Sequence, residues 1–425
     1  MRKESQFFTV FPSVVCKGKK SEITITTTHE KFPFSDDTYK VRIVPKEKRD
    51  VPRNKALKIL DNKFNECIVK AENNSISFSY FFESEQEYRL IVFDENGKRL
   101  YDFAIYALDE DLYDTIPYRG DLHMHTTCSD GIGTIAQTVS KSREKGLDFI
   151  CITDHHKYYP SAQAVKMFKN VDTGLKIFCG EEVHNCDMGY VHIVNFGSDY
   201  SVNEIIEENY DKLCNEFKKE AMANTELEYE KAYDFAMRKW ICEEIRRGGG
   251  KAIFPHPYWT ICDEYYSEMD FAMYTLNSGI YDIYEVMGGC TVYENQIQAA
   301  MWHELRLNGN DMPIVASTDT HNPDIIGKYT TIVFAKSEED MQDAIMNRRS
   351  VGVESIPGEH HRVVGNFRLM KYGIFLVNNF YPVYESYTKG LGELILNYEK
   401  DSSFADVISK VNSKAESFRN KFFGK

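Results

Sequence analysis

Several features that would point to other classes of protein are missing from this 425-residue sequence. It has no apolar run near the ~20 residues that a membrane-spanning helix needs, so we expect no membrane association. None of its ten cysteines forms a Cys-x-x-Cys pair. We therefore expect free thiols in a reducing compartment and a cytoplasmic protein. The N-terminal stretch lacks a sustained apolar segment and a small-residue cleavage site, which argues against a secretory signal.

A basic surplus is also missing. The 51 Lys and Arg residues are outnumbered by 65 Asp and Glu residues, and the net charge is -14. Proteins that wrap nucleic acid usually carry a basic stripe, so we expect no nucleic-acid partner. Hydrophobic residues at 42% and charged residues at 27% are ordinary globular values, which excludes a disordered or fibrous chain.

The first hundred residues alternate apolar and polar side chains with period two, which is typical of half-buried strands. We expect strands at 22–28, 39–44, 75–81, 87–93 and 101–106. This pattern predicts a small antiparallel β-sandwich of immunoglobulin-like type over residues 1–112. An acidic run at 109–111 and then Pro117 mark the boundary.

Beyond this boundary, short apolar runs alternate with helix-like stretches, which indicates an α/β domain with a largely parallel sheet over residues 113–355. Thr134 followed by Gln137 is typical of a capping box at a helix start. Residues 356–425 are expected to form a C-terminal extension that packs on this domain.

The most informative feature is an ordered series of histidines and carboxylates, each at or just past a short apolar run. Imidazole and carboxylate are the ligands that hold zinc, manganese or iron. His123 and His125 alternate on one expected strand, so both rings should face the same ion. The series consists of His123, His125, Asp130, Asp154, His155, Glu181, Glu182, His192, His256, Asp319 and His321.

Four blocks of this series resemble the motifs of the PHP (polymerase and histidinol phosphatase) family of metallohydrolases, in the family's order. They are Arg119-Gly-Asp-Leu-His-Met-His-Thr-Thr-Cys-Ser-Asp130, Thr153-Asp-His155, His256-Pro257 and Ser317-Thr-Asp-Thr-His321. The resemblance implies a distorted (β/α)7 TIM-like barrel with two to three divalent metal ions (Zn, Mn or Fe), used mostly to hydrolyse phosphate esters. The first block, after a β-rich segment, is also similar to the carbaryl-hydrolase-like branch.

The resemblance also implies three groups of metal ligands. Glu182 is preferred to Glu181 because the family pattern is Gly-x-Glu and because alternation from Gly180 returns to the same face at 182. His192, on an apolar strand, also fits a hydrogen-bonded core histidine. The implied groups are His123, His125, Glu182 and Asp319; Glu182, His192 and His256; and Asp130, His155 and His321.

Such ions would lower the pKa of bound water and supply a metal-activated hydroxide, so no protein nucleophile is needed. Ser129 has no Gly-x-Ser-x-Gly elbow around it. Asp154 or His156 is expected to protonate the leaving group, or else to orient a ligand. Arg119 is a candidate for binding the substrate phosphate, with a surface charge as the alternative.

These patterns predict a metal-dependent hydrolase. The leading hypothesis is a phosphoesterase that hydrolyses a small phosphomonoester or phosphodiester at a trinuclear site. One alternative is an ester, carbamate or amide hydrolase that uses the same metals on a carboxyl ester substrate. A non-catalytic metal-bearing binding protein is the alternative from another class, and the sequence predicts no oligomeric state.

Overall fold

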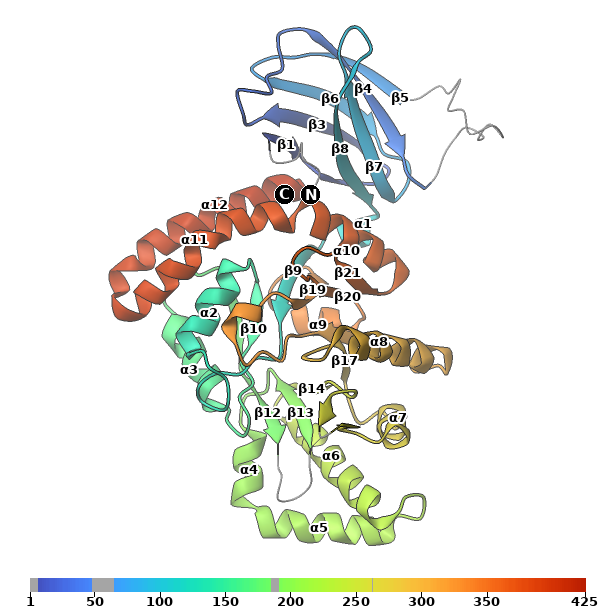
Figure 1. Cartoon of the computed structure of the whole chain (residues 1–425), viewed down its shortest axis with the longest axis vertical. Coiled ribbons are helices and arrows are strands. Elements are labelled where there is room, and N and C mark those ends of the chain that lie inside the picture. Colours follow the sequence, from blue (N-terminus) through green and yellow to red (C-terminus); the bar gives the residue numbers. More distant parts are fainter. Residues whose placement is uncertain (1–6, 48–64, 185–190, 262) are drawn as a thin grey trace. The chain divides into compact units, whose positions relative to one another are not determined.

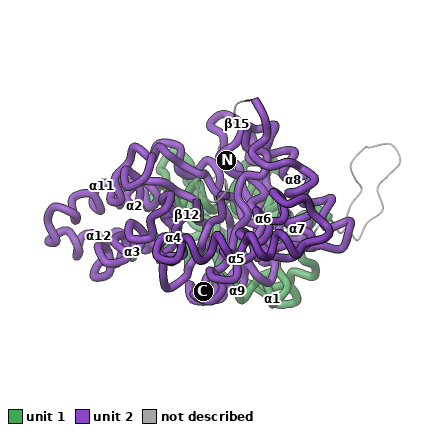
Figure 2. Tube along the Cα trace, turned by 90° about the horizontal axis from the view of Figure 1, so that it is seen from below, with its two compact units in different colours: residues 1–116, 374–387, 413–425 green, residues 117–373, 388–412 purple. Residues whose placement is uncertain are grey.

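The computed structural model describes residues 7–47, 65–184, 191–261 and 263–425. By its contacts the chain divides into two compact units, which Figure 2 colours separately. The first contains residues 1–116, 374–387 and 413–425, and the second contains residues 117–373 and 388–412. The chain thus returns to the first unit twice near its C-terminus.

Two β-sheets build the N-terminal part of the first unit (Figure 1). One sheet has the strand order β1-β3-β6, and the other has the order β2-β8-β7-β4-β5. Both contribute to one buried cluster, which contains Ile25 of β3 and Leu90 of β7. The strands are β1 Phe8–Phe11, β2 Val14–Cys16, β3 Lys20–Thr27, β4 Thr38–Pro45, β5 Asn65–Lys70, β6 Ser75–Phe81, β7 Gln86–Phe93 and β8 Arg99–Leu108.

The predicted alternation is clearest in β7, where Tyr88, Leu90 and Val92 are buried and the residues between them are half-buried. The β-rich N-terminal region is confirmed. The expected antiparallel pairing has one exception, because β2 runs parallel to β8. Only two residues separate β1 from β2, so the chain does not reverse direction between them. β2 therefore enters the other sheet in the direction of β1, and this direction makes it parallel to β8.

The C-terminal segment contains the strand β21 (Arg362–Gly365) and the helices α10 (Phe367–Asn379), α11 (Tyr381–Lys400) and α12 (Ala405–Phe423). Residues 374–387 and 413–425 belong to the first unit. There the ring centroid of Phe380 lies 5.8 Å from that of Phe418. We expected an extension packing on the α/β domain, but these helices contribute to both units. A helix of 20 residues such as α11 is ~30 Å long, which gives it the reach to do so.

The second unit has a mixed α/β fold with two large sheets, of order β11-β10-β9-β19-β20-β21 and β12-β13-β14-β17-β18, and the two-stranded sheet β15-β16. β9, β10 and β11 pair in parallel, as do β14, β17 and β18, whereas β13–β14 and β19–β20 are antiparallel. The largely parallel sheet that we expected is therefore only partly present. Seven residues separate β12 from β13, and seven separate β20 from β21. A parallel crossover needs a dozen or more residues, so these pairs are antiparallel.

The strands of this unit alternate with helices along the chain (Figure 1, cyan to orange). The predicted capping box is present at α2, where Thr134 accepts from the Gln137 backbone. The helices are α2 Ile135–Glu144, α3 Tyr159–Phe168, α4 Val202–Glu208, α5 Tyr210–Ala223, α6 Tyr229–Arg247, α7 Met269–Asn277, α8 Val292–Leu307 and α9 Met341–Met346; α1 (Glu110–Tyr113) precedes them. The strands are β9 Ile116–Asp121, β10 Phe149–Cys151, β11 Lys176–Phe178, β12 Gly180–His184, β13 His192–Phe196, β14 Lys251–Phe254, β15 Thr260–Ile261, β16 Glu264–Tyr265, β17 Ile283–Met287, β18 Ile314–Ala316, β19 Tyr329–Ala335 and β20 Ser350–Glu354.

Buried apolar side chains line both sheets of this unit. Phe254 of β14, Tyr284 of β17 and Trp302 of α8 belong to one large cluster. Ile150 of β10 and Val139 of α2 belong to another. Within the described part of the chain, no helix combines the length and apolar character required to cross a bilayer.

Arg143 of α2 is a fully buried charge inside the second unit. Its Nη1 lies 3.4 Å from Oδ1 of Asp148, which is also buried. Its Nη2 donates a 2.8 Å hydrogen bond to Oδ1 of Asn412. This guanidinium therefore ties the end of α2 both to the residues before β10 and to α12.

We expect Arg143→Met to lower the free energy of unfolding by about 3–5 kcal/mol, because removing one partner leaves the other charge buried and uncompensated. Urea unfolding followed by circular dichroism measures this loss. The control is Lys141→Met on the same helix, whose pair with Glu144 is 25% and 30% exposed. Such a pair contributes about 1 kcal/mol or less, so equal losses from the two variants would contradict the assignment.

Candidate metal centre

Two backbone bridges bring the ends of several strands together. Met124 forms a parallel bridge with Thr320, and His155 forms one with Glu182. The first bridge sets the residues on either side of Met124 against those on either side of Thr320. The predicted donors His123 and His125 therefore meet Asp319 and His321, because this bridge joins the segments that carry them.

Glu182 lies at the middle of the resulting cluster and is completely buried. Its two carboxylate oxygens are surrounded by five histidine nitrogens. From Oε2 the distances are 3.1 Å to His123 Nε2, 3.3 Å to His125 Nε2 and 3.1 Å to His155 Nδ1; from Oε1 they are 2.7 Å to His192 Nδ1 and 3.6 Å to His256 Nε2.

Glu181 faces a different environment. Its carboxylate accepts hydrogen bonds from the Ser201 hydroxyl at 2.8 Å and from the Val202 N–H at 2.5 Å. It therefore satisfies the N-terminus of α4. Of the two glutamates considered from the sequence, the one in the cluster is Glu182.

Donor atoms gather into three groups, and within each group they lie within 4.8 Å of one another. The groups are His123, His125, Glu182 and Asp319; His125, Asp130, His155 and His321; and His155, Glu182 and His192. The first equals the group that the resemblance implies, and the second adds His125. His256 is not in the third group, but its Nε2 lies 3.9 Å from Asp319 Oδ2.

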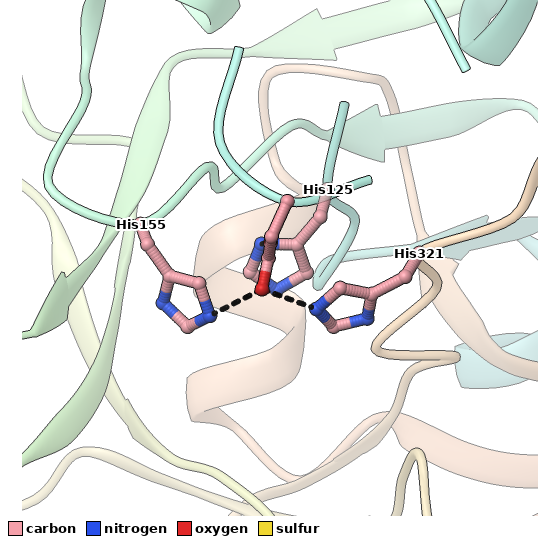
Figure 3. A group of neighbouring side chains, drawn as sticks. His125, His155 and His321 are labelled. Carbon is pink, nitrogen blue, oxygen red and sulfur yellow. Dashed lines mark ion pairs between the residues drawn. The ribbon is translucent and has the colours of Figure 1, made fainter. Parts of the chain in front are cut away.

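Figure 3 shows His125, His155 and His321 turned toward one another. Its dashed lines are ion pairs with Asp130 Oδ2, which lies 3.7 Å from His155 Nε2 and 3.3 Å from His321 Nε2. The side chains of Asp130 and His321 are 54% and 40% exposed. This group is thus the open side of the centre, whereas the group around His123 is buried.

The donors fit divalent cations. Imidazole nitrogen and carboxylate oxygen suit zinc, manganese and iron. Among the described residues, the buried Nδ1 atoms of His125 and His256 have no hydrogen-bond partner. Burial alone would raise the pKa of Glu182, but the histidines around it hold that pKa well below its usual range. The site thus holds buried negative charge that demands positive charge beside it.

Asp121 supports the backbone of this centre, and no sequence pattern assigned it a role. It is buried, and it accepts hydrogen bonds from the backbone N–H of His123 at 3.3 Å and of Thr318 at 3.1 Å. Burial raises its pKa to about 7. Asp121 therefore joins the end of β9 to the segment after β18. It stands within the first motif, but one buried carboxylate in a strand carries no distinguishing pattern.

Asp154, expected as a proton donor, has both oxygens engaged. Oδ1 accepts from the Thr126 N–H at 2.8 Å and from the Ser129 hydroxyl at 2.6 Å, and Oδ2 accepts from the Thr126 hydroxyl at 2.7 Å. The Ser129 N–H also donates to Oδ1, at 3.1 Å. Asp154 thus secures the segment that carries Asp130.

His156, the other expected proton donor, lies at the exposed edge of the cluster. Its ring stacks on that of His184, with centroids 4.9 Å apart. The ring centroid of His184 in turn lies 4.9 Å from that of His155 and 4.4 Å from that of His192. Burial lowers the pKa of both His156 and His184, to about 4 for His184.

Arg119 does not lie in the cluster. Its guanidinium donates to the backbone carbonyl of Lys145, and its own N–H donates to Asp148 at 2.9 Å. Lys145 ends α2 before the chain enters β10, whereas the donor groups follow the strands. The expectation that Arg119 binds the substrate phosphate is therefore not supported, because its side chain secures the opposite end of these strands.

Comparison with known proteins decides the family. The model of the PHP domain matches residues 121–351, more than half of the chain. The chain belongs to the PHP domain family. No curated protein matches it.

Solved structures similar to this PHP protein have low sequence identity. A two-domain protein of Bacteroides vulgatus, described as containing a PHP-like metal-dependent phosphoesterase, is 17% identical over 56% of this chain, with a TM-score of 0.40. This chain spans only 65% of that protein's length. A protein of Bifidobacterium adolescentis described as a metal-dependent phosphoesterase is 16% identical, covering 48% of this chain and 87% of its own, with a TM-score of 0.35. An amidohydrolase from Chromobacterium violaceum is 15% identical over 48% of this chain and 88% of its own, with a TM-score of 0.32.

Aromatic side chains next to the paired strands β15 and β16 line one side of the PHP centre. The ring of Trp259 lies 5.7 Å from those of His192 and His256. The ring of Tyr266 lies 5.0 Å from that of His192. No sequence pattern signals Tyr266, whose N–H donates a 2.7 Å hydrogen bond to the Trp259 carbonyl and which is thereby held beside Trp259.

Positive backbone φ angles also concentrate at the centre. His156, His256 and Asp319 have φ angles of 58°, 25° and 50°. Residues other than glycine adopt such angles rarely, and they persist where surrounding contacts hold them. These three angles set where the side chains point, and no sequence pattern signals them.

The contacts of Asp154 predict a contrast between two substitutions. Asp154→Ala removes an acceptor from four donors and should lower the free energy of unfolding by about 1–3 kcal/mol. Asp154→Asn keeps an oxygen for the three donors at Oδ1, and the Thr126 hydroxyl oxygen can accept from the new NH2 group, so most of the stability should remain. Thermal unfolding of the metal-free proteins measures both. If asparagine were as destabilising as alanine, this account of the segment would be wrong.

Proposed function

We propose that this PHP protein is a metal-dependent phosphoesterase that hydrolyses a small phosphomonoester or phosphodiester. The observation that carries the proposal is the convergence of nine predicted ligands, namely the buried carboxylate of Glu182 and eight side chains gathered near it. The family supports a metal-dependent hydrolase. The phosphate ester as the bond that is cleaved is our inference.

We also propose that the second unit is a distorted (β/α)7 barrel. The bridges Met124–Thr320 and His155–Glu182 support this, because each connects the two large sheets. The first joins the segment after β9 to the segment after β18, and the second joins the segment after β10 to β12. Active sites of such barrels gather at the carboxyl ends of the strands. His123, His155, His256 and Asp319 follow strand ends, as this arrangement requires, whereas Glu182 lies within β12 and His192 begins the antiparallel strand β13.

The centre would hold two to three divalent ions of zinc, manganese or iron. Glu182 would be shared between two ions, because its two oxygens face different histidines. When bound, the ions lower the pKa of water and stabilise charge on the phosphoryl oxygens. His123 and Glu182 are completely buried, so they hold the inner part of the centre away from water.

The open side of the centre, formed by Asp130 and His321, is where the substrate would enter. His156 remains the proposed proton donor for the leaving group, because it is exposed next to His155, whereas Asp154 is fully engaged. The rings of Trp259 and Tyr266 would limit the space beside His192 and His256.

A hydrolase of carboxyl esters, carbamates or amides is the second candidate. The position of Arg119 favours this second candidate, because its guanidinium contacts the Lys145 carbonyl outside the centre and so is not placed to bind a substrate phosphate. Imidazole and carboxylate ligands serve carbonyl and phosphoryl centres alike. The bond that is cleaved must therefore be determined by assay.

We expect the purified protein to contain zinc, manganese or iron and to hydrolyse p-nitrophenyl phosphate or bis-p-nitrophenyl phosphate faster than p-nitrophenyl acetate. Elemental analysis and rates measured after reloading with each metal check this. Faster ester cleavage would favour the second candidate. Bound metal without hydrolysis of any of the three would favour a non-catalytic binding protein.

We expect Glu182→Gln to lower kcat/KM by at least about 100-fold, the upper end of the effect of removing groups that only support ligands. The amide cannot provide two anionic oxygens to two ions, so the metal content should fall as well. His303→Gln is the matched control, because His303 is exposed on α8. A Glu182→Gln variant with full metal content and activity would exclude the shared role of Glu182.

A further inference from the structure

Glu285 of β17 is fully buried beside the centre, but it belongs to none of the three donor groups. Its Oε2 lies 3.2 Å from Nδ1 of His123. Its Oε1 accepts a 3.3 Å hydrogen bond from the backbone N–H of His256. One carboxylate therefore contacts two segments that each carry a proposed ligand.

The chemistry of a carboxylate determines the protonation of His123. An ionised carboxylate only accepts hydrogen bonds, so Nδ1 of His123 carries the proton that points to Glu285. The other ring nitrogen, Nε2, lies 3.1 Å from Glu182 and 3.3 Å from Asp319. This arrangement leaves the Nε2 lone pair for an ion in the first donor group.

Two glycines after β17 leave room for the carboxylates. A Cβ on Gly288 would lie 2.0 Å from Oε1 of Glu285, and one on Gly289 would lie 2.7 Å from Oδ2 of Asp319. Asn295 of α8 holds this turn, because its Oδ1 accepts from the Gly288 N–H at 2.9 Å. A side chain at Gly288 would have to displace Glu285 or the turn itself.

We propose that Glu285 is a positioning residue of the metal centre and that Gly288 provides the space it needs. Glu285 holds His123 in the tautomer that presents Nε2 to the ion, and it fixes the backbone of His256, whose φ angle is 25°. The inference rests on the proposed function, since it assumes that ions occupy the centre.

Glutamine cannot replace Glu285 without loss. Glu285 accepts from two donors through two different oxygens. A glutamine of the same shape has one oxygen and one NH2 group. In Glu285→Gln, either the Nδ1–H of His123 or the N–H of His256 would face another donor.

The test is the affinity for Zn²⁺, measured by competition with a chromophoric chelator, together with the visible absorption spectrum of the Co²⁺-loaded protein. We expect Glu285→Gln to bind Zn²⁺ about 10- to 100-fold more weakly and to change the Co²⁺ spectrum. The control is Glu244→Gln. Glu244 is a buried glutamate of α6 that pairs with Arg247 and accepts from the Tyr200 hydroxyl, so its loss should leave both readouts unchanged.

The outcomes separate the two proposals. If the wild-type protein bound neither Zn²⁺ nor Co²⁺, the proposed function would fail. If the wild-type protein bound both and Glu285→Gln matched it in affinity and spectrum, only the positioning role would be excluded. Circular dichroism confirms that each variant is folded, and the isosteric glutamine decides the question even if Glu285→Ala does not fold.

The role of Gly288 has its own test. Gly288→Ala should weaken Zn²⁺ binding in the wild-type background, but it should add little in Glu285→Ala, where the displaced carboxylate is absent. Gly390→Ala is the control, because a Cβ there meets no atom within 4 Å. An equal loss from Gly288→Ala in both backgrounds would overturn the proposed link to Glu285.

Discussion

The buried carboxylate of Glu182 is the constraint on which the rest of the centre depends. Five histidine nitrogens surround it at 2.7–3.6 Å. A buried anion is costly unless positive charge lies beside it. The segments at the strand ends of the second unit therefore surround a buried negative charge, which divalent cations would neutralise. The apolar clusters of this unit keep water away from that charge.

A second set of buried carboxylates holds the donors in place without belonging to the donor groups. Asp121 contacts the backbone after β9 and β18, Asp154 secures the segment before Asp130, and Glu285 contacts His123 and His256. Asp121 and Glu285 each accept hydrogen bonds from two segments that are distant in sequence, and Asp154 accepts from one segment that is distant from its own. Such groups orient ligands and fix their tautomers, and they explain how a polar centre stays rigid inside an α/β core.

Some of this was accessible from residue types and spacing. His123-x-His125 and Asp319-x-His321 were identified as donor pairs, and the structure brings them together through the Met124–Thr320 bridge. Glu285 was missed because its strand reads as an apolar run. Asp154 and Arg119 were given catalytic roles, but the structure turns Asp154 to Thr126 and Ser129, and Arg119 to the Lys145 carbonyl. These contacts join segments far apart in the chain, so local pattern could not reveal them.

The sequence by itself determined the kinds of donor, their order and their place at the ends of apolar runs, because imidazole and carboxylate chemistry is a property of the residues. Tertiary structure alone decided which atoms face one another. The parallel bridge of His155 with Glu182 sets one register, and the positive φ angles of His256 and Asp319 turn two ligands inward. Both depend on contacts between distant segments, which hold the backbone in conformations that its local sequence does not favour.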